Sequence, residues 1–185
     1  MCGRLVAVLV SLTLAGCADI TPPPDTAQLP PGAFGVFDND VAAANQASAA
    51  LASPARTRND PVDAARACAA IDYLAGELSS NPRWIKLSPL TKQEMLQARV
   101  DVRQVLGIEP NAPSQFVVNA LLQFTAAWQA GNQPAALQAL SAPVFTLPPQ
   151  QTLAILSNLP LIRSANVASI DAANQMLPGG DMLHR

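Results

Sequence analysis

Carboxylates are the main residues of this sequence that could do chemistry. Two carboxyl groups at a suitable separation can cleave a glycosidic bond. The candidates are Asp60, Asp63, Asp72, Glu77, Glu94 and Asp101. The first two and Glu94 stand at predicted helix starts, where acids stabilise the positive end of the helix dipole. We expect the other three on solvent-facing sides of helices, so the pattern favours structural roles and we assign no catalytic residue.

The position of the one histidine excludes catalytic and metal sites that need histidine. The single histidine, His184, is next to last in a glycine-preceded tail. A Ser-His-Asp triad, a Cys-His pair or a multi-histidine metal site therefore cannot be assembled within one folded chain. The sequence also contains no glycine-rich phosphate loop and no calcium-loop pattern. We expect no metal and no cofactor.

Cys68 could be a reactive thiol or a buried small side chain. It recurs with Ala64, Ile71, Ala75 and Leu78 at helical spacing, on what should be the inner side of a helix. A cysteine among apolar neighbours behaves as a small hydrophobic residue. We interpret Cys68 as part of the core.

Basic residues form one candidate binding stripe. Lys92, Arg99 and Arg103 are spaced by seven and four residues, which places them along one side of a helix. Such a stripe could meet lipid phosphates or the carboxylates of peptidoglycan. The alternative is a solvated face with acids such as Asp101 nearby.

A second candidate lies in the segment NPRWIKL, residues 81 to 87, where Trp84 stands between Arg83 and Lys86. Tryptophan with arginine is the composition of binding hot spots. Equally, Trp84, Ile85 and Leu87 could close one end of a helical bundle. The possible partner-binding residues are therefore Arg83, Trp84, Lys86, Arg99 and Arg103.

Composition limits the class of protein. The 185 residues are 50% hydrophobic and 13% charged, with a formal net charge of -2, which fits one modest domain with low-complexity flanks. Nucleic-acid binding would need clustered Lys and Arg on a basic domain. We therefore expect no nucleic-acid partner.

The amino terminus has the pattern of an export signal. Arg4 precedes an apolar run from Leu5 to Leu14, which matches a signal-peptide core of about ten residues. A spanning helix needs roughly 20 apolar residues. A processed signal therefore fits this run better than an anchor helix does.

The four residues Leu14, Ala15, Gly16 and Cys17 follow directly. They resemble the lipobox of bacterial lipoproteins. The resemblance implies that the Cys17 thiol takes a diacylglycerol, that the chain is cut before it, and that the new amino terminus is acylated. Ala18 in place of Asp resembles an outer-membrane address and favours the outer over the inner membrane. The alternative is an ordinary secretory signal cut near Ala18.

Residues 17–37 are predicted to be a lipidated cysteine and a linker. Consecutive prolines, Pro22 to Pro24 and Pro30 to Pro31, favour extended polyproline II. Such a semi-rigid stalk would lift a domain up to roughly 60 Å from the membrane. Alternatively, Phe34, Val36 and Phe37 dock on the domain.

From residue 38 onward, apolar periods near 3.6 residues predict only helices. The first follows Asp38 or Asp40 and ends before Pro54, and the second runs from Pro61 to 79–80. We expect an all-α fold, a small irregular bundle of about five to seven short helices, over residues 38–177. Residues 1–16 are the predicted signal peptide and 178–185 a flexible tail.

The third helix carries the most specific local signals. Thr91 and Glu94 have the spacing of a capping box, and Leu90 and Met95 that of a hydrophobic staple. Gly107 is placed to end this helix in the left-handed conformation.

The remaining helices are bounded by serine, glycine and proline. Ser114 is the predicted cap of a fourth helix that Gly131 ends. A short fifth helix would run over 133–141. A sixth opens at Pro148 and Pro149, and a last weak helix reaches about residue 177.

These patterns lead to one functional expectation with two alternatives. We expect a periplasm-facing lipoprotein of a Gram-negative cell envelope, anchored to the membrane by its lipid, that binds an envelope protein or peptidoglycan and is not an enzyme. One alternative is a carboxylate-dependent enzyme or accessory factor acting on cell-wall glycan, for which Asp72 and Glu77 are the residues to test. The other is a structural tether without a specific partner.

Overall fold

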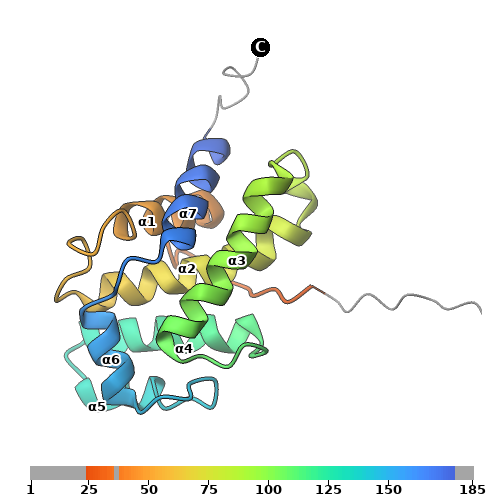
Figure 1. Cartoon of the computed structure of the whole chain (residues 1–185). Helices are drawn as coiled ribbons and strands as arrows, with labels where there is room; N and C mark the ends of the chain where they lie inside the picture. Colours follow the sequence, from red (N-terminus) through yellow and green to blue (C-terminus); the bar gives the residue numbers. More distant parts are fainter. Residues whose placement is uncertain (1–23, 36–37, 178–185) are drawn as a thin grey trace, which may run out of the picture.

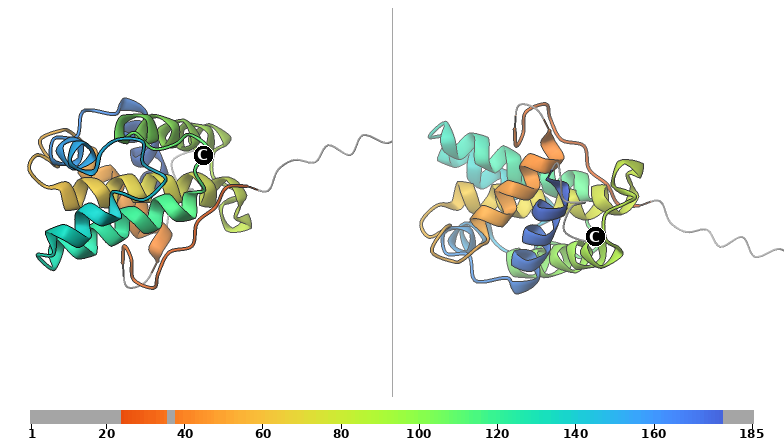
Figure 2. Two further views of the ribbon diagram at one scale, coloured as in Figure 1. Left: turned by 90° about the horizontal axis from the view of Figure 1, so that it is seen from below. Right: turned by 90° about the horizontal axis from the view of Figure 1, so that it is seen from above.

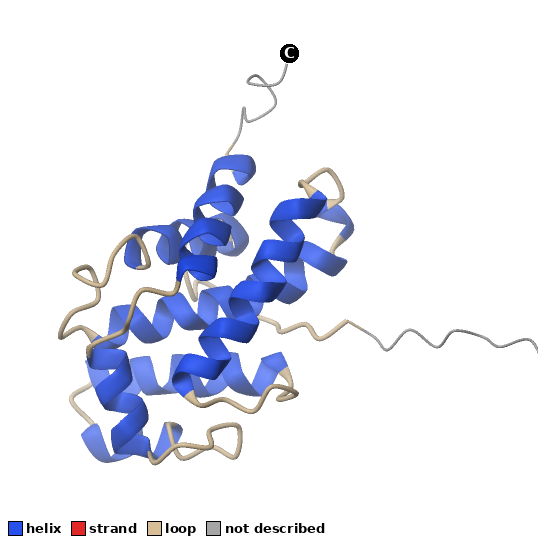
Figure 3. Cartoon of the chain, viewed as in Figure 1, coloured by secondary structure: helices blue, strands red, loops and turns tan. Residues whose placement is uncertain are grey.

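The computed structural model describes residues 24–35 and 38–177, and over these residues the chain is helical (Figures 1 and 3). The elements are α1 (Asn39–Ala50), α2 (Pro61–Ser80), the 3-10 helix η1 (Pro82–Trp84), α3 (Pro89–Leu106), α4 (Ser114–Gln129), α5 (Gln133–Ala139), α6 (Pro149–Ser157) and α7 (Arg163–Met176). Extended pairing within the described ranges is limited to an isolated bridge between Ile108 and Phe145. The predicted all-α bundle is confirmed.

Helix α2 forms the centre of the bundle (Figure 1). It packs against α1, α3, α4 and α6, while α7 lies on α1 and α3, and α5 packs on α4 and α6. Fourteen of its 20 residues are buried, many of them alanines. Small side chains allow neighbouring helices to approach on every side, and Ile71, Leu74 and Leu78 fill the remaining core.

Several predicted helix ends are confirmed. Asp38 caps α1 by accepting from the backbone N–H groups of Asp40 and Val41. Asp60 caps α2, whose first residue is Pro61. Gly107 ends α3 with φ 63°, and the N–H of the next residue reaches back to a carbonyl of the last turn.

Two predicted caps are wrong. Helix α3 begins at Pro89, with Ser88 at the cap position and no side-chain cap hydrogen bond, so Thr91 lies inside the helix. The Thr91 hydroxyl accepts instead from Gln175 Nε2 of α7 at 2.8 Å. Ser114 likewise makes no cap hydrogen bond to α4, because its hydroxyl is used in a long-range contact described below.

Residues 24–35, here named the strap, lie against the domain, so the prediction of a free stalk is wrong for them (Figure 2). Ala27 is buried. The Gln28 N–H donates to Gln115 Oε1 at 2.7 Å, and Gln115 Nε2 donates to the Gln28 carbonyl at 3.1 Å. Arg66 donates to the Ala33 carbonyl at 3.0 Å and its guanidinium lies 5.4 Å from the Phe34 ring centroid.

Some predictions fall outside the described residues. These are the signal peptide (1–16), lipidation of Cys17, docking of Val36 and Phe37, and the tail (178–185). Among the helices that the structure describes, none combines the length and the apolar character needed to cross a bilayer.

Candidate functional site

The five possible partner-binding residues separate into two groups, and the first is an internal network. Arg103 on α3 is 4% exposed. Its Nε and Nη2 donate to the two oxygens of Asp72 on α2, at 2.7 and 2.8 Å. Its Nη1 donates to the carbonyls of Pro110 and Ala112. The second Nη2 proton is directed at Ser114 Oγ, so every donor of the guanidinium has a partner. The prediction of a solvent-facing stripe is therefore wrong for Arg103. The prediction of a solvent-facing Asp72 is also wrong, because Asp72 is 1% exposed.

The same network holds the strap. Asp25 accepts from the Ser114 N–H and hydroxyl, both at 2.8 Å, and lies 3.3 Å from Arg99 and 3.4 Å from Arg103. Burial acts to raise the pKa of Asp25, but the hydrogen bonds from Ser114 and the two arginine charges outweigh it and hold that pKa below its usual value. Arg99 is thus engaged by the strap. Lys92 is the remaining basic residue of the predicted stripe, and it is partly exposed.

An open pocket of about 510 Å³ lies beside this network. It is lined by strap residues 24–26, by Arg99 and Arg103, and by Pro110, Asn111 and Pro113. The two arginines already face Asp25 and Asp72, so the pocket presents no unpaired cation from this pair.

The second group surrounds the carboxylate of Asp40, at the start of α1. This side chain accepts from Tyr73 Oη at 2.5 Å, Trp84 Nε1 at 3.0 Å and Arg83 Nη1 at 3.2 Å. Arg83 also pairs with Asp38, and its guanidinium lies 4.4 Å from the Trp84 ring centroid. Arg83 and Trp84 are therefore fixed in one orientation.

Beyond this cluster the chain exposes apolar side chains. Leu87 is buried and Trp84 is half-buried, as expected for residues that close one end of the bundle. Ile85 is 76% exposed, so the prediction that it also closes this end is wrong. Leu90, predicted to form a staple, is 63% exposed. Lys86 lies between them in sequence and is exposed. We name Ile85, Lys86 and Leu90 the tip surface.

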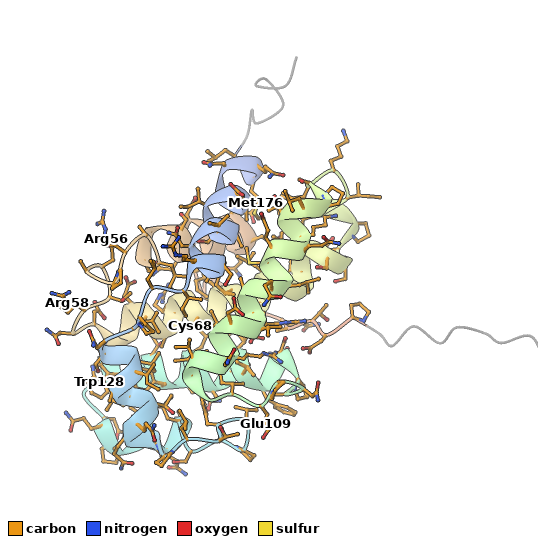
Figure 4. The ribbon with its side chains drawn as sticks, viewed as in Figure 1. Arg56, Arg58, Cys68, Glu109, Trp128 and Met176 are labelled. Atoms are coloured by element: carbon orange, nitrogen blue, oxygen red, sulfur yellow. The ribbon has the colours of Figure 1, made fainter. Side chains whose placement is uncertain are left out.

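Cys68 is buried in the core, and the carboxylates of Glu77 and Asp101 are hydrogen-bonded to neutral side chains. Cys68 lies in the interior near the centre of the molecule (Figure 4), which confirms its predicted place in the core. Burial, with the nearby charge of Asp72, raises its thiol pKa to about 12. Glu77 is partly buried and accepts from Asn81, and Asp101 accepts from Gln97 and Ser164. Over the described ranges no group of three or more His, Cys, Asp or Glu side chains could hold a metal ion.

Comparisons with known proteins return no match, whether with protein-family models, curated proteins or solved structures.

Proposed function

We propose that this chain is a lipid-anchored protein of the Gram-negative cell envelope, acylated on Cys17 and facing the periplasm, whose helical domain binds another envelope component without catalysing a reaction. The observation that carries the proposal is the sequence Leu14-Ala15-Gly16-Cys17 directly after a short apolar run. Ala18 in the next position favours the outer membrane.

Acylation would determine where the domain works. One acyl chain gives only marginal membrane binding, whereas two or more hold a protein stably, at about 0.8 kcal/mol per buried CH₂. A triacylated Cys17 would keep the protein at its membrane. The bundle would then act at that surface and not in free solution.

The binding role is supported by the second group of residues. Arg83 and Trp84 are held rigid by Asp38 and Asp40, so little side-chain entropy is lost when a partner contacts them. The tip surface beside them adds exposed apolar area and the amine of Lys86. Together they form a small mixed surface of the kind that protein and envelope partners contact.

Metabolic labelling with a palmitate analogue tests the anchor. The native chain should incorporate the label and fractionate with membranes, whereas Cys17→Ser should do neither. A mature chain that begins at a residue other than Cys17, with an unmodified amino terminus, would overturn the proposal.

Affinity purification from detergent-solubilised membranes tests the binding role. A double variant Ile85→Glu, Lys86→Glu should lose most of the envelope protein, peptidoglycan or lipid that the native chain retains. The matched control is Arg56→Glu, Arg58→Glu, which changes two exposed basic residues on the loop between α1 and α2 (Figure 4). Equal retention by all three chains would remove the binding role.

A further inference from the structure

The turn between α2 and α3 lies at the end of the molecule where the strap leaves it. Both views of Figure 2 show the first described residues and this turn at the same end of the bundle. The contacts place the strap at the same end: Asp25 and Thr26 cross α2 at Gly76, one turn before the helix ends at Ser80. The loops at the other end of α2 and α4 point away from the strap exit.

The distance from the anchor to this end is short. Six residues separate Cys17 from Pro24. Even fully extended, seven residue steps span at most about 25 Å. Because the strap is docked from Asp25 onward, the length available to a tether is much less than a free linker over residues 17–37 would give.

The chemistry of the tip surface fits a lipid–water interface. Ile85 and Leu90 are the two most exposed large hydrophobic residues among those described, at 76% and 63%. Exposed Lys86 stands between them, and Lys92 follows in the first turns of α3. Apolar side chains enter the upper acyl region, whereas lysine amines remain with the headgroup phosphates. The carboxylates of Asp38 and Asp40 are already paired with Arg83, and that of Glu77 accepts from Asn81. Glu94, four residues after Leu90 on α3, is partly buried.

The strap leaves the domain beside the tip surface, and the chain from there to Cys17 is short. We infer that the tip surface rests on the lipid bilayer that holds the anchor. Ile85 and Leu90 insert into the bilayer, and Lys86 lies at the phosphates. This inference rests on the proposed lipidation of Cys17, and it makes the lipid bilayer the envelope component that the tip surface binds. Two apolar side chains and one or two amines bind a bilayer weakly by themselves, but a tether raises their effective concentration at the surface. The contact orients the domain, so that the loops with Arg56, Arg58 and the far end of α4 face away from the membrane (Figure 4).

The two tryptophans give a direct test, because Trp84 adjoins the tip surface and Trp128 lies at the far end of α4 (Figure 4). The full lipidated chain is reconstituted in phosphatidylethanolamine–phosphatidylglycerol vesicles, with or without bromine near the top of the acyl chains. Trp128→Phe leaves Trp84 as the sole emitter, and its emission should fall in brominated vesicles. Trp84→Phe leaves Trp128, whose emission should be unchanged.

Variants connect the quenching to the tip surface. In the Trp128→Phe chain, adding Ile85→Glu and Leu90→Glu should abolish the loss of Trp84 emission. The matched control adds Val167→Glu, an exposed apolar position on α7, and should keep it. Circular dichroism of each chain checks that the helices are retained.

Vesicle flotation separates the two proposals. A chain that floats with vesicles but shows no quenching of Trp84, or equal quenching in all variants, overturns the membrane contact and leaves the anchor standing. A chain that carries no lipid and does not float overturns the proposed function itself.

Discussion

Asp72 and Arg103 form a two-point ion pair across the contact between α2 and α3, with both carboxylate oxygens accepting from one guanidinium at 2.7 and 2.8 Å. Both side chains are almost fully buried, at 1% and 4% exposure. Their charges are therefore compensated inside the bundle, and two carbonyls of the loop after α3 use the remaining Nη1 donors.

Removing one partner of this pair should be costly. Asp72→Asn leaves the Arg103 charge buried beside a neutral amide, and loss of one member of a buried pair costs about 3–5 kcal/mol. Urea denaturation followed by circular dichroism measures the change. Asp101→Asn, a partly exposed carboxylate on α3 bonded only to neutral groups, should cost about 1 kcal/mol or less. Similar losses for both variants would contradict this account.

Asp25 should make the docked strap sensitive to acid. The pKa of Asp25 is lowered in the folded chain, so its contribution is present above the unfolded pKa of about 3.9 and is lost as the pH falls through the lower folded value. Asp25→Asn should lower the free energy of unfolding at pH 7 by about 1 kcal/mol, comparable to the loss of a helix cap. In this variant the free energy of unfolding should also fall less as the pH is lowered. Asp60→Asn, an exchange between two good capping residues, is the control. Parallel pH profiles for native and Asp25→Asn chains would exclude the role.

Gly76 should be required for the strap to lie where it does. A Cβ at this position would collide with the Asp25 carbonyl and come within 2.9 Å of Thr26 Cα. Gly76→Ala should therefore release the strap, although alanine is favoured over glycine in a helix by about 1 kcal/mol. Hydrogen exchange at the Gln28 and Ser114 amides, which the strap contacts protect, should become faster. Ser80→Ala on the same helix should leave both amides protected, and unchanged exchange in Gly76→Ala would refute the prediction.

Tyr73, the only tyrosine, should report on the Asp40 cluster at high pH. Burial and its hydrogen bond to Asp40 raise its phenol pKa. The stability it contributes is therefore complete below the unfolded pKa of about 10 and is lost as the pH rises through the folded value. Absorbance at 295 nm should show no phenolate until the helices unfold. Tyr73→Phe should cost about 1 kcal/mol, and free ionisation near pH 10 in the folded chain would contradict the geometry.

Cys68 should be unreactive while the domain is folded. Its side chain is fully buried and its thiol pKa is raised to about 12, so both access and thiolate are lacking at pH 8. A chromogenic disulfide reagent should modify it only after urea is added. Ser79→Cys, at an exposed position of the same helix, should react at once.

Local signals predicted the helices better than they predicted the contacts between them. The caps at Asp38 and Asp60 and the left-handed Gly107 depend on a few adjacent residues, and the structure confirms them. The predicted box at Thr91 satisfies the same local rule, yet the hydroxyl bonds to Gln175, 84 residues away. No local pattern contains that partner.

The interior polar residues were missed for a related reason. The helix neighbours of Asp72 are all small or apolar, so the apolar period of α2 does not identify an outer face. Asp25 falls in a proline-rich segment that resembles a linker by composition alone, and its partner Ser114 lies 89 residues on. The candidate residues of the turn, by contrast, lie within four positions of one another in the sequence. In the structure, Arg83 and Trp84 both donate to Asp40.

The strap also determines where a pulling force on the amino terminus would act on the bundle. If the amino terminus is held at a membrane, as proposed, tension along the chain would reach the fold at Asp25 and pass to α4 through Ser114 and to α3 through Arg99 and Arg103. Helix α1, next along the chain, is shielded from that tension while these bonds hold. We therefore expect the strap to detach first under pulling, which would lengthen the chain between Cys17 and the helices before any helix unfolds.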